Sequence, residues 1–101
     1  MYSVTKTQFR PNPETKFYFE KFRPTDDVKK YIKEKFMDTG KLIKTDINLT
    51  GDRAEFKTLW ESRAALLEFQ TDEFISDNVI SPAFNYELDN DIKTSFVVEE
   101  I

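Results

Sequence analysis

Residues 42–69 read LIKTDINLTGDRAEFKTLWESRAALLEF, and this stretch decides the fold. The pattern predicts a strand, a tight turn, a second strand and the start of a helix. A two-residue hairpin turn at Thr50-Gly51-Asp52-Arg53 sets the register of the two strands. That register pairs Leu49 with Ala54, Ile47 with Phe56, Thr45 with Thr58 and Ile43 with Trp60.

The predicted hairpin has one apolar and one polar face, because side chains alternate along a strand. We therefore expect Ile47, Phe56 and Trp60 in the core. The opposite face is polar apart from Leu59 and carries Lys44, Asp46, Asn48, Glu55, Lys57 and Glu61.

The length and composition fit one domain over residues 1–101 and exclude several kinds of chemistry. The chain has ten Phe, four Tyr and one Trp, which predicts an aromatic core. It has no Cys and no His. Thiolate and imidazole metal sites, haem ligation by imidazole and Ser-His or Cys-His nucleophile pairs are thereby excluded. We expect no catalytic residue, metal or cofactor.

Charge and hydropathy indicate a protein that binds neither nucleic acid nor membrane. The net charge is −4, and the lysines at 29, 30, 33 and 35 are interleaved with acidic residues around one helix, as on a solvated helix face. No apolar run has the length of a signal peptide or a membrane span. The expected location is the cytoplasm.

The remaining elements follow from caps, breakers and periodicity. We expect strands at 2–10 and 92–100, a helix from Thr25 to about Met37, and a short helix capped by Ser62. Helix restarts at Thr71-Asp72, and Ser81-Pro82 is interpreted as a second cap for helix to about Leu88. Residues 16–22, KFYFEKF, are either a short edge strand or loop that covers the core, or an arm bearing Phe17 and Phe19 that packs on a partner subunit.

This order of elements, β-α-β-β-α-α-β, predicts a ferredoxin-like α+β sandwich. Its four-stranded antiparallel sheet has helices on one face, with the first and third strands in the centre. The other sheet face is left open.

Part of the chain resembles the dimeric α+β-barrel proteins related to antibiotic-biosynthesis monooxygenases. The resemblance is carried by Leu59-Trp60, Glu61-Ser62-Arg63-Ala64-Ala65, Phe69 and Asp72-Glu73-Phe74. It implies a homodimer in which two open sheet faces form a barrel, and a pocket between sheet and helices. Haem-degrading members have Trp and His where this chain has Phe69 and Asn78, so the resemblance does not extend to haem chemistry. The opening MYSVT and Phe9-Arg10-Pro11 are also similar to small proteins of tailed phages of marine bacteria, which would place the protein in a host cytoplasm.

Two hypotheses of function follow. The first is a non-catalytic homodimeric binding or assembly protein. A small-molecule ligand is compatible with this role, but the sequence does not identify it. The second is a cofactor-independent monooxygenase-like enzyme acting on a small aromatic or oxygenated substrate. Its pocket would be lined by Tyr31, Trp60, Asn78 and Tyr86, although the three aromatic residues are more readily interpreted as core. The expected dimer interface comprises Thr5, Thr7, Phe17, Phe19, Lys44, Asp46, Lys57 and Leu59.

Overall fold

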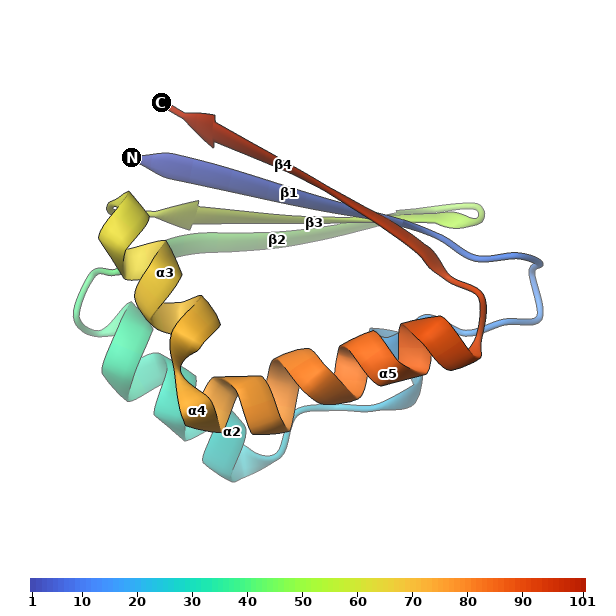
Figure 1. The fold of residues 1–101 in the computed structure, drawn as a ribbon, viewed down its shortest axis with the longest axis horizontal. Coiled ribbons are helices and arrows are strands. Elements are labelled where there is room, and N and C mark those ends of the chain that lie inside the picture. The colour runs from blue at the N-terminus through green and yellow to red at the C-terminus, as the bar shows by residue number, and fades with distance from the viewer.

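The computed structural model describes residues 1–101, which form an α+β fold. The strands are β1 (Tyr2–Phe9), β2 (Leu42–Thr50), β3 (Arg53–Trp60) and β4 (Lys93–Glu100). The helices are α1 (Tyr18–Lys21), α2 (Asp26–Ile32) with its π-helical extension η1 (Lys33–Met37), α3 (Arg63–Thr71), α4 (Glu73–Ile75), η2 (Ser76–Ile80) and α5 (Ser81–Asp89). All helices lie on one side of the sheet, seen nearly edge-on in Figure 1. None of them combines the length and the apolar character that a membrane span requires.

The sheet is antiparallel with strand order β2-β3-β1-β4, so the first and third strands are central as predicted. Two ends of the chain run side by side, and the Ile101 N–H donates to the Met1 carbonyl at 2.8 Å. This is the ferredoxin-like architecture expected from the order of elements.

The register of the central hairpin agrees with the prediction over most of its length. Leu49 pairs with Ala54, Ile47 with Phe56 and Thr45 with Thr58. Gly51 supplies the positive φ, +60°, that the turn requires. The predicted pairing of Ile43 with Trp60 is wrong: a bulge between Leu42 and Lys44 places Leu42 opposite Trp60. The bulge turns Leu42 into the core and leaves Ile43 exposed.

The assignment of Ile47 to the core is also wrong. Ile47 is on the apolar face of β2, but it is 54% exposed. It lies on an edge strand that the helices cover only near Leu42, and Phe56 on the neighbouring strand is half-buried. Trp60, at the other end of β3, is buried as expected.

Helix starts follow local capping chemistry. Thr25, Ser62 and Asp72 accept hydrogen bonds from the N–H groups of Val28, Ala65 and Ile75, which fixes the first turns of α2, α3 and α4. Ser81 does not cap a new helix, because helical structure continues from α4 through η2 into α5. In η2 the Ser81 N–H bonds to the Ser76 carbonyl five residues earlier, and this wide turn precedes Pro82, which has no N–H to donate.

The aromatic segment covers the core, as the first of the two readings expects, but it does so as a loop and a short helix and not as an edge strand or an arm. Phe17 is fully buried and packs with Ala54 and Ile92, and Tyr18–Lys21 forms the short helix α1. Phe19 stacks on Phe17 and meets the ring of Phe56 edge-on. Both phenylalanines therefore lie on the helix side of the sheet, within their own subunit.

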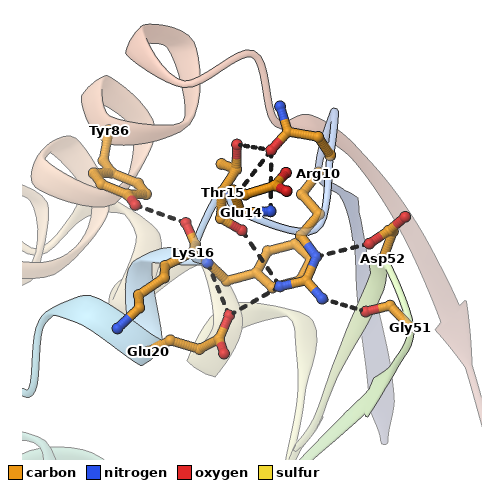
Figure 2. Close-up of polar contacts among 10 residues, drawn as sticks. Arg10, Glu14, Thr15, Lys16, Glu20, Gly51, Asp52 and Tyr86 are labelled. Carbon is orange, nitrogen blue, oxygen red and sulfur yellow. Dashed lines mark hydrogen bonds and ion pairs between the residues drawn. The ribbon is translucent and has the colours of Figure 1, made fainter.

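Arg10 fastens this segment to the β2–β3 hairpin, as Figure 2 shows. Its guanidinium donates to Asp52 Oδ1 at 3.0 Å, to the Gly51 carbonyl at 2.8 Å and to the Thr15 carbonyl at 3.3 Å. It also lies over the ring of Phe17, 5.3 Å from the centroid. A single side chain thus connects the loop after β1, the hairpin turn and the buried ring of Phe17.

Candidate functional site: a cavity between the sheet and α5

A cavity of about 870 Å³ lies between the helix side of the sheet and α5. Its lining comes from all four strands and from α2, α3, η2 and α5, and 14 of its 22 lining residues are hydrophobic. A volume of this size with mostly apolar walls and a few polar groups is typical of small-molecule sites. The cavity is the candidate functional site.

The cavity exists because α5 stands away from the sheet. Thr45 and Thr58 on the sheet and Ala83 on α5 are short side chains that leave the space unfilled. The large residues of α5, Phe84 and Leu88, border the cavity but remain 57% and 62% exposed. They form an apolar rim rather than a plug.

A chain of polar contacts crosses one wall of the cavity. Lys6 Nζ on β1 lies 3.2 Å from Glu87 Oε2 on α5, and the Thr94 hydroxyl on β4 donates to Glu87 Oε1 at 3.0 Å. Gln8 Nε2 in turn donates to Thr94 Oγ1 at 3.4 Å. Gln8 and Glu87 are buried, so this network holds a carboxylate and an ammonium in place inside a mostly apolar wall.

Trp60 borders the cavity at its other end. Its indole N–H donates to Thr58 Oγ1 at 2.8 Å, and both residues line the cavity. The indole is packed by Phe36 and Phe69 at centroid distances of 6.5 and 5.0 Å. Trp60 is therefore both core and cavity wall.

The other residues of the predicted pocket lie elsewhere. Tyr31 and Asn78 border a separate shallow depression at the start of α4, and the Asn78 side chain donates to the Phe74 carbonyl four residues earlier in the same helical segment. Tyr86 does not line the cavity, and its hydroxyl donates to the Lys16 carbonyl at 2.6 Å; this bond is drawn in Figure 2. The structure therefore does not bring the four residues into one pocket, since only Trp60 among them lines the cavity between the sheet and α5.

Tyr31 belongs to a polar cluster that joins α2 and η1 to α4. Its hydroxyl donates to Asp72 Oδ2 at 2.6 Å, and Lys35 Nζ contacts both groups. Burial alone would raise the pKa of Asp72, but the hydrogen bonds from Lys35 and Tyr31 outweigh it and lower that pKa to about 2. Hydrogen bonds to Asp72 and Tyr31 raise the pKa of Lys35. Because Asp72 also caps α4, we assign this cluster a structural role.

Six of the eight residues of the expected dimer interface share the open sheet face. The strand pairing Thr5–Lys57 and Asp46–Lys57 places these side chains together, with Thr7, Lys44 and Leu59 on the same side. Phe17 and Phe19 do not belong to this set, because they pack inside the subunit on the opposite side of the sheet.

Sequence reasoning missed Lys6 and Glu87. Lys6 and Val4 point to the same side of β1, and Val4 packs in the core. The sequence therefore already contained a signal for Lys6, namely a charged residue on an apolar strand face. Glu87 follows Ala83 by four residues and so shares its helix face. No signal in the sequence indicates that these two side chains meet, since they are 81 residues apart.

Comparisons with known proteins define the class of fold. The chain matches no protein-family profile and no curated protein. Among solved structures it is similar to a dimeric ferredoxin-like protein from an uncultured marine organism, with a TM-score of 0.62 and 12% identity over 100% of this chain and 94% of the other. A second protein of that description and source gives a TM-score of 0.60 and 17% identity, covering 99% and 94% of the two chains.

A third similar structure is a Deinococcus radiodurans protein provisionally described as an antibiotic biosynthesis monooxygenase. The TM-score is 0.58 with 5% identity, and the match covers 100% of this chain and 92% of the other. These matches show that the chain has a ferredoxin-like α+β fold, as the resemblance in its sequence implied; two of the three similar proteins are described as dimeric.

Proposed function

We propose that this protein is a homodimeric binding protein whose cavity between the sheet and α5 takes a small, mostly apolar molecule. The observation that carries the proposal is the cavity itself, about 870 Å³ in volume and lined by 14 hydrophobic residues among 22. The exposed rim residues Phe84, Leu88 and Phe96 support it, since a ligand in the cavity would remove apolar surface from water.

Titration calorimetry with naphthalene, a neutral apolar probe, tests the proposal. We expect saturable binding of one molecule per subunit. Ala83→Trp should abolish or strongly weaken it, because the indole would occupy part of the cavity that Ala83 lines. Ala64→Trp places the same side chain on the exposed side of α3 and should bind as the wild type does. Absence of saturable binding to the folded wild type would contradict the proposal.

The dimer is proposed to form through the open sheet face. Opposite charges support this arrangement, because Lys44 and Lys57 share the face with Asp46 and Glu55 and could pair across a twofold axis. Leu59 and the half-exposed Val97 supply apolar surface there. The description of two structurally similar proteins as dimeric points the same way.

Sedimentation velocity at tens of micromolar tests the dimer. The wild type is expected to sediment as a dimer and Leu59→Glu as a folded monomer, because the new charge would be desolvated at the apolar part of the interface. Leu67→Glu, on an exposed position of α3, is the matched control and should remain dimeric. A monomeric wild type would refute the dimer, and a dimeric Leu59→Glu would move the interface to another surface.

A second candidate function is cofactor-independent oxygenation of a bound substrate. It is favoured by the fold shared with the Deinococcus radiodurans protein and by a polar pair, Lys6 and Glu87, inside an apolar cavity. Oxygen uptake with 2-naphthol separates the two functions. The binding protein is expected to consume no oxygen above the Ala83→Trp level, and sustained uptake by the wild type alone would favour the enzyme.

We also propose that the protein acts in the cytoplasm, as expected from its sequence. An origin in a tailed phage stays a prediction of the amino-terminal resemblance, and the genes that flank the coding sequence would test it.

A further inference from the structure

The ammonium group of Lys6 is held in the cavity wall between two aromatic rings. Its Nζ lies 5.7 Å from the centroid of Phe56 and 5.9 Å from that of Phe96, and both rings also line the cavity. The side chain is 27% exposed, against 7% for the Glu87 side chain with which it pairs. Both side chains line the cavity, and that of Lys6 is the more exposed of the two.

Lys6 retains hydrogen-bonding capacity that the protein does not use. An ammonium group carries three donors, and one of them is directed at Glu87 Oε2. Glu87 is itself fixed through its second oxygen by Thr94, which is held by Gln8. The network therefore orients the ammonium rather than saturating it, and two N–H donors remain for an oxygen atom of a ligand.

The charges around the cavity limit which chemical group of the ligand can supply the oxygen that Lys6 binds. Lys6 and Lys93 contribute two positive charges to the lining, and Glu87 and Asp91 contribute two negative charges. A lining without net charge does not compensate the desolvation of a strongly anionic group such as a phosphate or sulfonate. It does accept a neutral oxygen, for which a charged donor gives a strong hydrogen bond.

From this geometry we infer that Lys6 recognises the polar end of the ligand, and that the ligand is a neutral, mostly apolar compound carrying a carbonyl or hydroxyl oxygen. An aromatic compound fits best, because Phe56 and Phe96 flank the ammonium and would meet its ring beside the hydrogen bond. The inference rests on the proposed binding function and adds to it the class of ligand and the residue that selects it.

A matched set of probes tests the inference by titration calorimetry: naphthalene, 2-naphthol and 2-naphthoate. The measured quantity is the ratio of the naphthol affinity to the naphthalene affinity, which cancels the contribution of the shared rings. Lys6→Met keeps most of the aliphatic stem and removes the donors. It should lower this ratio about tenfold, the usual effect of one hydrogen bond to a charged group. Lys30→Met, on the exposed side of α2, should leave the ratio unchanged.

The double variant Lys6→Met/Glu87→Gln guards against a folding defect, because it leaves no buried carboxylate without its cation. It should fold and show the same tenfold loss of the ratio. A ratio that stays at the wild-type value in both variants, while naphthalene still binds, would overturn the role of Lys6 and leave the binding function intact. Tighter binding of 2-naphthoate than of 2-naphthol to the wild type would overturn the neutral class of ligand. Failure of all three probes to bind would overturn the inference together with the proposed function.

Discussion

The two ends of the layer between sheet and helices are built differently. At one end seven buried residues, Val4, Phe36, Leu42, Trp60, Ala65, Leu66 and Ile75, form one apolar cluster, which we call the large cluster. At the hairpin end three buried residues, Phe17, Ala54 and Ile92, form the small cluster. The cavity lies against both, since Trp60 and Ile92 line it.

The comparison of the two clusters shows how a chain of this size combines a stable fold with a cavity. The large cluster relies on interlocking aromatic rings, with Phe36, Trp60 and Phe69 in mutual contact. The small cluster is supplemented by polar fastenings, namely Arg10 on the hairpin and the Tyr86 hydroxyl on the Lys16 carbonyl. We interpret the large cluster as the source of most stability and the hairpin end as the part that leaves room for a ligand.

The largest effect is expected from Phe36→Ala. Phe36 is fully buried in the large cluster, so its loss should lower the free energy of unfolding by about 3 to 5 kcal/mol. Phe56→Ala removes an identical side chain that is half-buried and already borders the cavity, and should cost roughly 1 to 2 kcal/mol. Urea unfolding measures both. Equal costs would show that the two ends are packed alike and that the comparison is wrong.

A smaller effect is expected from Arg10→Met, which tests the polar fastening of the hairpin end. The substitution leaves two backbone carbonyls, those of Gly51 and Thr15, without their donor, and removes a cation from the face of Phe17. We expect a loss of about 1 to 3 kcal/mol in thermal or urea unfolding. Arg63→Met, on an exposed position of α3, is the control and should change stability little. A similar result for both variants would mean that Arg10 does not hold this end together.

The third effect concerns pH and the helices beside the large cluster. The pKa of Asp72 is about 2 in the folded protein, below the value of about 3.9 for an unfolded chain. A lowered pKa stabilises the folded state above the unfolded value, and this contribution is lost as the pH falls through the folded value. The stability advantage of the wild type over Asp72→Asn should therefore be constant above about pH 5 and shrink towards pH 2.

Asparagine keeps the capping oxygen of Asp72, so the comparison isolates its charge. Asp38→Asn removes the exposed partner of Lys33 and serves as the control, which should follow the wild type across the range. An Asp72→Asn difference that does not change with pH would contradict the assigned contacts to Lys35 and Tyr31.

The parts of the fold predicted from the sequence are those that local chemistry decides. The register near the turn follows from Gly51, and the starts of α2, α3 and α4 follow from Thr25, Ser62 and Asp72. Ser81 was misread because a cap followed by proline also fits a continuous helix whose preceding turn is widened. A helix start can be predicted from a few neighbouring residues, whereas its absence depends on the turns before it.

The candidate site could be predicted only in part, because it depends on how far α5 lies from the sheet. Trp60 was placed correctly on the helix side, since strand parity determines it. Strand parity determines to which side of the sheet a side chain points, but not whether a helix covers it. For this reason the prediction that Ile47 lies in the core was wrong. The pairing of Lys6 with Glu87 needs the tertiary structure, because it joins the first strand to the last helix.

The central claim, that the cavity admits a small apolar molecule, is tested most directly at Trp60. It is the only tryptophan, so its indole N–H gives one identifiable signal in a ¹H–¹⁵N correlation spectrum. This N–H bonds to Thr58 Oγ1 in the cavity wall. We predict that naphthalene shifts the indole signal saturably, together with backbone amides of β1, β3 and α5, while amides of α2's exposed face remain unchanged. An indole signal that does not move at saturating naphthalene would contradict the account.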